Sequence, residues 1–145
     1  MAEILYKLEQ SPAQPCSACI QWLNANDYKE FNRHLRLAGQ KTHGRRIFKG
    51  YYDKGIARYC LLYCDGLPVA RGAIEPYSEQ AWEAADIRTA REYRNRGFAK
   101  EMLLFLSRYI LEHGKTATCR TEEHNTAMQK VILSIGYARA NGDSR

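Results

Sequence analysis

Residues 89–106, TAREYRNRGFAKEMLLFL, join a polar, basic segment to an apolar helical repeat at a single glycine, Gly97. Three arginines precede that glycine: Arg91, Arg94 and Arg96. The first turn of a helix exposes unpaired backbone N–H groups and carries about half a positive charge. Arginines beside that end would repel it in the absence of an anion. The stretch therefore indicates either a phosphate-binding site or a solvated basic turn without a ligand.

Two other phosphate-binding motifs fail on their spacing. Gly114-Lys115-Thr116 matches the end of a P-loop, but the residue five positions before Gly114 is Tyr109 instead of glycine. This tripeptide also follows the predicted helix, whereas a P-loop precedes one. A dinucleotide-binding fingerprint requires three glycines, and only Gly97 is present.

Apolar periodicity and turn residues on both sides of this stretch predict alternating strands and helices. Asp65-Gly66 lies between two apolar runs, which is typical of a β-hairpin turn. The expected strands are 3–8, 57–64, 67–74, 81–89, 116–121 and 137–141. The expected helices are two short ones within 17–37, then 98–113 and 125–135, and residues 39–55 are expected to form a loop. This order predicts an α/β fold, a mixed central sheet flanked by helices on both faces.

Length and composition predict one soluble domain, 1–145, in a chain of 145 residues. The net charge of +6 favours anionic partners such as nucleic acid, phosphates or an acidic cofactor. The N-terminus lacks the basic and apolar regions of a signal peptide, and no apolar run reaches the roughly 20 residues of a membrane span. We therefore expect a cytoplasmic protein with no membrane partner.

Five cysteines raise the possibility of a metal site, with Cys16 and Cys19 as one pair and Cys60 and Cys64 as the other. The second pair falls in a predicted strand, where four residues span about 13 Å. Two ligands of one zinc ion lie only about 2.3 Å from the metal. We therefore expect no metal, and buried or half-buried thiols in a reducing compartment.

Three sequence elements, in the right order, resemble the GNAT superfamily of N-acetyltransferases. The first is Arg94-Asn95-Arg96-Gly97-Phe98-Ala99 between a strand and a helix, which matches the family pattern Arg/Gln-x-x-Gly-x-Gly/Ala. The second, CLLYCDGLPVARGAI, is similar to the central hairpin of the family, and the third, HNTAMQKVILSIGY, to its second half. The resemblance runs from Arg58 to Tyr137. It implies the GNAT fold and transfer of an acetyl group from acetyl-CoA directly to an amine.

The resemblance also implies where acetyl-CoA, the expected cosubstrate, would bind. The pyrophosphate would lie on the backbone before and within the helix start, and the pantetheine arm would lie along the preceding strand. The Ile87 N–H would polarise the thioester carbonyl. The implied cofactor-binding residues are Ile87, Arg88, Thr89, Arg94, Asn95, Arg96, Gly97, Phe98, Ala99, Lys100 and Asn125.

The catalytic residues are less constrained by the resemblance. An amine must lose a proton before it attacks, so a carboxylate acting through water is expected. Glu83 lies where some family members carry a catalytic glutamate, and strand alternation places it on the face of Ala85 and Ile87. Asp86 and Glu75 are the alternatives. Either Glu83 is the general base or it is an exposed glutamate at a strand end.

Two departures from the family pattern affect this interpretation. The position of the tyrosine that protonates the departing thiolate is Ile132, and Tyr137 and Tyr109 are the possible substitutes. A thiol pKa near about 8.5 allows CoA to leave without an acid. The C-terminal hairpin of the fold is apparently truncated. Its missing strand leaves a sheet edge for the N-terminal segment or a partner to cover, which makes a homodimer a hypothesis.

Two other functions stay open from the sequence. A non-catalytic CoA-binding sensor would keep the fold without the chemistry. A nucleic-acid-binding module would use the basic loop from Lys41 to Tyr59, where Phe48, Tyr51 and Tyr52 alternate with basic residues. A solvated loop beside a substrate site is the simpler interpretation of that segment. The acceptor amine is not identified, although the basic loop favours an acidic or neutral acceptor over a polybasic one.

Overall fold

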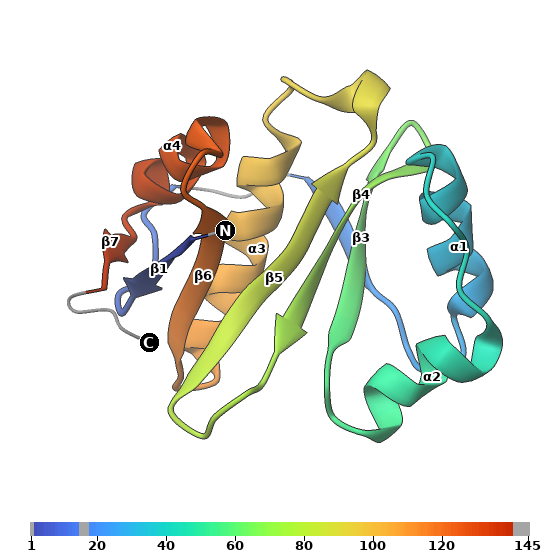
Figure 1. Ribbon diagram of the computed structural model, residues 1–145, viewed down its shortest axis with the longest axis horizontal. Coiled ribbons are helices and arrows are strands. Elements are labelled where there is room, and N and C mark those ends of the chain that lie inside the picture. The colour runs from blue at the N-terminus through green and yellow to red at the C-terminus, as the bar shows by residue number, and fades with distance from the viewer. Residues whose placement is uncertain (1, 15–17, 141–145) are drawn as a thin grey trace.

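The computed structural model describes residues 2–14 and 18–140, which form one seven-stranded sheet with helices packed against it (Figure 1). The strands are β1 (Glu3–Leu8), β2 (Cys19–Trp22), β3 (Arg58–Cys64), β4 (Leu67–Glu75), β5 (Ala81–Thr89), β6 (Thr116–Glu122) and β7 (Ala138–Arg139). The helices are α1 (Tyr28–Leu37), α2 (Arg45–Asp53), the short 3-10 helix η1 (Arg91–Tyr93), α3 (Phe98–Glu112) and α4 (Thr126–Ile135).

The sheet is mixed, as expected. Its strand order is β2-β3-β4-β5-β6-β1-β7, and every neighbouring pair is antiparallel except β5 and β6, which are parallel. The Asp65-Gly66 turn between β3 and β4 is confirmed, with both residues at positive φ (52° and 78°). The parallel pair is joined by a crossover through α3, which is the usual connection between parallel strands.

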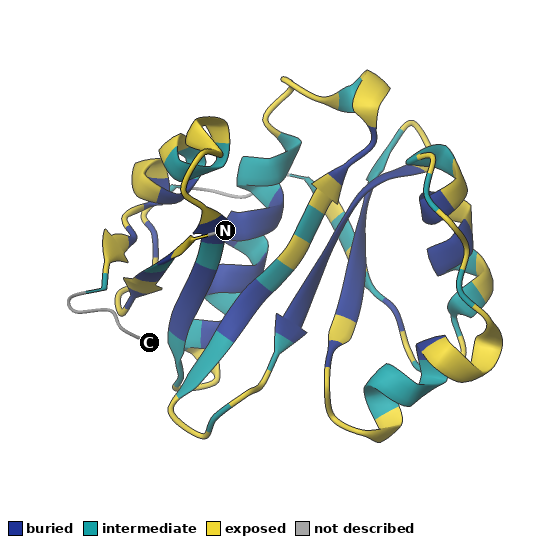
Figure 2. Ribbon diagram, viewed as in Figure 1, coloured by how far each residue is buried: buried dark blue, intermediate teal, exposed yellow. Residues whose placement is uncertain are grey.

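Helices cover both faces of the sheet, as two adjacent residues of β4 show. The Arg71 guanidinium contacts His34 of α1, whereas a Cβ on Gly72 would lie 2.6 Å from the Met102 Sδ of α3. Neighbouring strand residues point to opposite faces. We call the two sides of the sheet the α1 face and the α3 face. Figure 2 shows buried residues along β3, β4 and α3, whereas the segment before α3 is exposed.

Two expected elements were wrong. Residues 19–22, expected to be helical, form strand β2, which pairs with β3 from Cys19 opposite Tyr63 to Trp22 opposite Cys60. The spacing of Ile20 and Leu23 fits a helix, but four residues are too few to define a period, and pairing with a distant strand decides the structure. The start of the expected helix, residue 17, lies outside the described residues.

The second correction concerns residues 39–55, expected to be a loop, which contain α2. Phe48, Tyr51 and Tyr52 recur at the i, i+3, i+4 spacing of a helix face, and this pattern outweighs the glycines and basic residues around them. Phe48 is fully buried, and the aromatic side of α2 packs against a core cluster on the α1 face. α2 therefore completes the core cluster on the α1 face of the sheet.

The N-terminal strand β1 occupies the sheet position next to β6. It pairs with β6 from Glu3 opposite Glu122 to Leu8 opposite Ala117, and on its other side with the two-residue strand β7. From the sequence we expected either the N-terminal segment or a partner to cover an open sheet edge. In the structure, the N-terminal segment covers the edge of β6. The short C-terminal strand is confirmed at residues 138–139.

Candidate functional site

Strands β5 and β6 separate partway along their length. Their register partners run from Ala81 opposite Thr116 to Glu83 opposite Thr118, and no later pair joins them among the described residues. β5 continues to Thr89 and β6 to Glu122. Figure 1 shows the two strands diverging from this point. The edge of β5 beyond Glu83 therefore has backbone groups that do not pair with β6.

A β-bulge interrupts β5 within this unpaired region. Between Arg71 opposite Arg88 and Ala73 opposite Ala85, β4 advances two residues and β5 advances three. Asp86 has a φ of 49°, and neither Asp86 nor Ile87 has a register partner in β4. The extra residue reverses the alternation of side chains. The expectation that Glu83 and Ile87 share a face was therefore wrong, because Ile87 packs against the α3 core cluster.

The segment before α3 has the geometry that the sequence predicted for a helix start. Gly97 has a φ of 82°, in the left-handed region that glycine adopts without strain, and no side chain caps the helix. Asn95 is also left-handed, at 65°. The arginines fold back on this segment: Arg94 Nε donates to the Thr89 carbonyl at 3.0 Å, and the Arg96 guanidinium lies 5.0 Å from the Tyr93 ring centroid. The segment that leads into α3 is therefore exposed and largely basic, and no side chain caps the first backbone N–H groups of the helix.

Thr89, at the end of β5, carries an unsatisfied hydroxyl. Its Oγ1 is buried and has no hydrogen-bond partner, alone among the side-chain oxygens and nitrogens of the described residues. A buried polar atom without a partner is destabilising and normally has an explanation. Among the described residues, no group supplies that partner at the end of β5.

Asn125 begins the helix after β6, as predicted. Its Oδ1 accepts a hydrogen bond from the Met128 N–H at 3.1 Å, so it acts as the N-cap of α4. Because β5 and β6 are parallel, their C-terminal ends lie at the same edge of the sheet. The segment that leads into α4 and the segment that leads into α3 consequently lie at this same end of the sheet (Figure 1).

Three carboxylates gather on the α1 face near the point of separation. Glu75 and Glu83 are direct register partners, and Asp86 follows on β5. Glu83 is buried and pairs with the Arg120 guanidinium. Burial, with the nearby charge of Asp86, raises the pKa of Glu75. Sequence analysis predicted the three carboxylates but not their arginine.

Arg120 and Tyr77 are site residues that the sequence analysis missed. Arg120 lies 5.7 Å from the Tyr77 ring centroid, and the Tyr77 hydroxyl lies 3.0 Å from Thr118 Oγ1. Thr118 and Arg120 are two residues apart on β6, so alternation places both on one face. A charged residue in the otherwise uncharged strand TATCRT is the signal that could have identified Arg120.

The tyrosines considered as substitutes for the family acid are bonded elsewhere. Ile132 is fully buried in the core between α3 and α4. The Tyr137 hydroxyl bonds Ser107 Oγ at 2.7 Å, and burial raises the pKa of Tyr137. The Tyr109 hydroxyl accepts from Arg58 near the C-terminal end of α3, far from Gly97. The Tyr137 hydroxyl is therefore already engaged by Ser107, and Tyr109 lies at the opposite end of α3 from Gly97.

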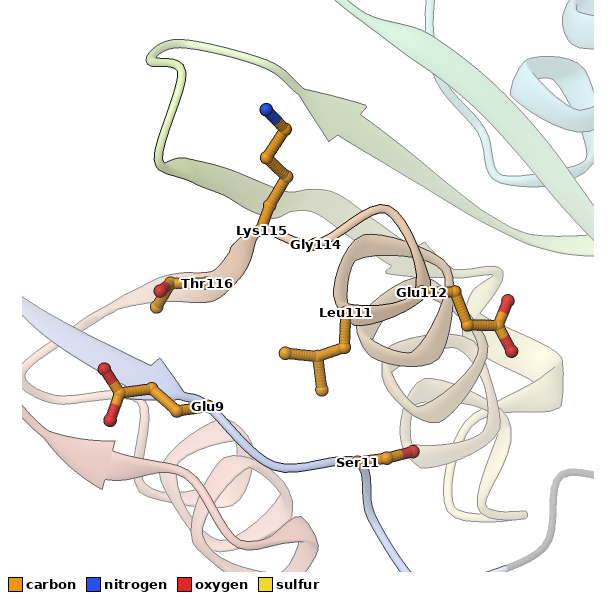
Figure 3. A pocket seen from close by; sticks show the side chains of 7 residues that line it. All are labelled: Glu9, Ser11, Leu111, Glu112, Gly114, Lys115 and Thr116. Atoms are coloured by element: carbon orange, nitrogen blue, oxygen red, sulfur yellow. The ribbon is translucent and has the colours of Figure 1, made fainter.

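Two cavities differ in their relation to this site. One of about 240 Å³ lies on the α1 face and is lined by Phe31, Leu35, Gln40, Lys41, His43, Arg71 and Asp86. The other, of about 470 Å³, lies at the C-terminal end of α3 (Figure 3) and is lined by Glu9, Ser11, Leu111, Glu112, Gly114, Lys115 and Thr116. A 15-residue helix is roughly 22 Å long, so the larger cavity is remote from the N-terminus of α3. Only the smaller one adjoins the bulge.

No group of three or more metal-binding side chains occurs within residues 2–14 and 18–140. Cys60 is buried with its Sγ 3.5 Å from Met102 Sδ, and Cys119 is also buried. Cys16 lies outside the described residues. No helix in the described part of the chain is long and apolar enough to cross a membrane.

The aromatic rings of the segment from Lys41 to Tyr59 pack largely inward. Phe48 is fully buried, and Tyr59 is buried with its hydroxyl bonded to Asp86 at 2.8 Å. Tyr51 and Tyr52 are half-buried against the same core cluster. The nucleic-acid hypothesis therefore loses Phe48 as a stacking ring, whereas Tyr51, Tyr52 and the basic charge of the segment keep part of their exposure.

Comparison with known proteins gives one family and many similar folds. Residues 17–137 match the model of the Acetyltransferase (GNAT) family. No match was found among curated proteins. Many solved structures are similar, and three of them are described next.

An acetyltransferase of the GNAT family from Colwellia psychrerythraea matches with a TM-score of 0.75 and 22% identity, over 95% of this chain and 52% of that chain. The ribosomal-protein-alanine N-acetyltransferase from Brucella melitensis biovar Abortus 2308 matches with a TM-score of 0.67 and 20% identity, over 89% of this chain and 96% of that chain. AAC(6′)-Iy, solved with the bisubstrate analog CoA-S-monomethyl-acetylneamine, matches with a TM-score of 0.67 and 17% identity, over 89% and 96%. The chain spans about half the length of the Colwellia protein. Identities this low show the fold alone.

Proposed function

The chain belongs to the GNAT acetyltransferase family, and from this premise we propose that it transfers an acetyl group from acetyl-CoA to a primary amine. The observation that carries the proposal is the separation of β5 and β6 beyond Glu83 and Thr118, next to the uncapped N-terminus of α3. A strand edge without a neighbour can pair with an extended ligand, and a helix start can bind a phosphate.

In this proposal the pyrophosphate of CoA lies on the backbone from Arg94 to Lys100. Gly97 allows close approach because its left-handed backbone carries no side chain. The backbone of Ile87, Arg88 and Thr89, along the part of β5 that β6 does not pair with, binds the pantetheine arm. Asn125 borders the same region from α4. The arginines near Gly97 are then explained by the anion that they help to hold.

The acceptor amine approaches from the α1 face, where the carboxylates lie. Its nitrogen, once deprotonated, attacks the thioester carbonyl carbon, the C–N bond forms, and the C–S bond breaks to release the CoA thiolate. We propose Glu83 as the general base, acting through water, with Glu75 as the alternative because burial raises its pKa. Asp86 is less suited, because three hydrogen bonds already occupy its carboxylate. The Ile87 N–H stabilises the charge that develops on the carbonyl oxygen.

Isothermal titration calorimetry with acetyl-CoA tests the binding half of the proposal. Wild type should bind with micromolar affinity. Gly97→Glu and Gly97→Gln impose the same backbone strain, but only the first adds a negative charge where the pyrophosphate should lie. Gly97→Glu should therefore bind much more weakly than Gly97→Gln. Equal affinities for the two variants, or no binding by wild type, would reject this cofactor site.

CoA release with a panel of amines tests the catalytic half. The panel should include peptides with an N-terminal alanine and an aminoglycoside, because two similar structures are an alanine N-acetyltransferase and an enzyme bound to an acetylneamine conjugate. It should also include free amino acids and polyamines. Binding of acetyl-CoA without release of CoA on any amine would favour the second candidate, a CoA sensor. The burial of Ile132 and the bonded hydroxyl of Tyr137 favour that candidate.

A further inference from the structure

Asp86 holds an unusual backbone conformation in the middle of a strand. Its φ of 49° lies in the left-handed region, which residues other than glycine seldom adopt, although aspartate and asparagine tolerate it better than most. Such a conformation persists only where surrounding contacts enforce it. The bulge is also the segment that orients Ile87, the next residue. The contacts of Asp86 therefore decide how the strand is shaped at the proposed thioester site.

The Asp86 carboxylate is held by two side chains from neighbouring strands. Arg71 of β4 donates from Nε to Oδ2 at 3.0 Å and from Nη2 to Oδ1 at 3.1 Å, which is the two-pronged geometry that a planar guanidinium provides. The Tyr59 hydroxyl of β3 donates to Oδ2 at 2.8 Å. Three hydrogen bonds thus fix the carboxylate. The Asp86 side chain therefore links the bulge of β5 to β3 and β4.

Arg71 is itself fixed from the α1 side. It is buried, and its Nη1 lies 3.3 Å from His34 Nε2 and also donates to Gln40 Oε1. His34 Nδ1 lies 2.8 Å from the Pro68 carbonyl, which can only accept. Nδ1 therefore carries the proton, and Nε2 accepts from Arg71. Burial lowers the pKa of His34 to about 4, so the ring is neutral and does not repel the guanidinium near neutral pH.

We propose that Arg71 and Tyr59 are positioning residues that clamp Asp86, and through it aim the Ile87 N–H at the acetyl carbonyl. This inference rests on the proposed function. The clamp acts on acetyl transfer without touching the reacting atoms. Arg71 and Asp86 also line the 240 Å³ cavity on the α1 face. An amine entering that cavity would therefore meet the clamp beside the carbonyl that Ile87 polarises.

Arg71→Lys and Tyr59→Phe test the clamp. Lysine keeps the charge but cannot form the two-pronged contact, and phenylalanine removes one hydroxyl while keeping the buried ring. We expect kcat for acetyl transfer to fall roughly 10- to 100-fold in Arg71→Lys, as for a misplacement of reacting groups, and less in Tyr59→Phe. The affinity for CoA, which has no acetyl carbonyl, should change less than about threefold in both, because the clamp does not touch the proposed pyrophosphate site and reaches the pantetheine arm only through the backbone of β5.

A signal from the Ile87 amide separates positioning from a general loss of structure. In protein labelled with ¹⁵N-isoleucine, with the peak assigned through Ile87→Val, the Ile87 amide of wild type should shift with acetyl-CoA and much less with CoA. Arg71→Lys should lose that difference. Thermal unfolding establishes whether each variant is folded. If Arg71→Lys does not fold, the kcat and the Ile87 shift of Tyr59→Phe test the positioning role.

The outcomes distinguish the clamp from the function on which it rests. If wild type neither binds acetyl-CoA nor acetylates an amine, the proposed function fails and the clamp loses its role. If wild type does both, but folded variants keep the wild-type kcat and the wild-type Ile87 shift, the clamp proposal alone is overturned. A loss of kcat together with the acetyl-dependent shift, at unchanged CoA affinity, supports it.

Discussion

Glu83 and Thr118 are the last register partners between β5 and β6, and the two strands separate beyond them. Glu83 is also the carboxylate that pairs with Arg120 across this point. Glu83 thus belongs to the acidic cluster on the α1 face and also marks the point where β5 and β6 separate. A base at this position would reach an amine on one side of the sheet while the thioester enters from the edge of β5.

Glu83→Gln should lower kcat roughly 100-fold or more at neutral pH, because a neutral amide cannot accept the proton of the amine. Affinity for acetyl-CoA should stay near the wild-type value. Steady-state kinetics with calorimetry measures both quantities. Glu75→Gln is the matched variant on the facing strand, and a larger loss of kcat there than in Glu83→Gln would transfer the role of base to Glu75.

The pH dependence of activity is a second test of whether Glu83 or Glu75 is the general base. A carboxylate base works when deprotonated, so activity should fall as the pH drops through its pKa. Because burial and the charge of Asp86 raise the pKa of Glu75, catalysis by Glu75 would move the acidic limb of kcat/KM to higher pH than an ordinary glutamate gives. That limb should be absent in Glu75→Gln if Glu75 is the base, and should persist there if it is not.

Arg94→Ala should weaken acetyl-CoA binding by about 1–3 kcal/mol, the usual loss for a charge-assisted hydrogen bond. Its guanidinium bonds the Thr89 carbonyl, so the substitution also loosens the end of β5. Arg91→Ala removes the same charge from the same exposed segment and serves as the control. Calorimetry at two salt concentrations measures both. Equal losses in the two variants would mean that only overall charge matters.

The strong local patterns of the sequence predicted much of the fold and part of the site. The Asp65-Gly66 turn, the glycine before α3 and the asparagine before α4 each carry a local backbone requirement, and each was correctly placed. Strand β2 and helix α2 were missed for different reasons. β2 is too short to show a period, and its structure depends on pairing with β3. The helical spacing in α2 was present but was hidden by glycine and basic residues.

The bulge at Asp86 could not be predicted from the sequence, because an extra residue in one strand has no local signature in AWEAADIRT. Because the bulge was not foreseen, Glu83 and Ile87 were wrongly expected on the same face of β5. Arg71 does carry a signal, since it is the lone basic residue in the apolar strand LPVARGAI. A charge in such a strand indicates an ionic partner for a buried arginine, although that partner, Asp86, is known only from the structure.

Stability should fall as the pH drops from about 6.5 to about 4, because of His34. Burial chiefly lowers the His34 pKa from 6.5 to about 4, with Arg71 also lowering it and the Pro68 carbonyl and Asp86 raising it. Between these two values the unfolded chain binds a proton that the folded chain does not. The folded state therefore loses up to about 3 kcal/mol over this window and nothing above it.

Urea unfolding at pH 7, 6, 5 and 4 measures this slope. His34→Gln removes the titrating ring but keeps an amide that can donate to Pro68. It should be less stable than wild type at pH 7 and should show a smaller loss of stability between pH 6.5 and 4. Parallel slopes in the two proteins would assign the pH dependence to other groups.

Gly72→Ala should destabilise the protein by about 1–3 kcal/mol through overpacking. The added Cβ would lie 2.6 Å from Met102 Sδ and 2.9 Å from Leu106 Cδ1, and both side chains are fully buried. Met102→Ala alone creates a cavity. When combined with Gly72→Ala, it also removes the sulfur atom that the added Cβ would clash with. The double variant should therefore be less destabilised than the sum of the two single variants, as a double-mutant cycle of denaturation would measure. Simple additivity would show that Met102 does not limit this position.

The N-terminal strand should be indispensable, because β1 is an interior strand although it comes first in the chain. Lys7 has an exposed side chain, and its backbone lies between Thr118 of β6 and Ala138 of β7. Lys7→Ala removes the side chain and keeps the backbone N–H, whereas Lys7→Pro removes both. Lys7→Pro should be less stable than Lys7→Ala by about 1–3 kcal/mol, the cost of a buried hydrogen-bonding group left without a partner.

The same pair of variants addresses the homodimer hypothesis, which began from an uncovered sheet edge. With β1 in place the β6 edge is covered within one chain, so wild type needs no second copy to complete it. Weakening β1 should expose that edge, and sedimentation should then show self-association in Lys7→Pro but not in Lys7→Ala. A dimer of equal strength in wild type and both variants would place the interface elsewhere. A monomeric Lys7→Pro variant with the stability of Lys7→Ala would mean that β1 contributes little to the sheet.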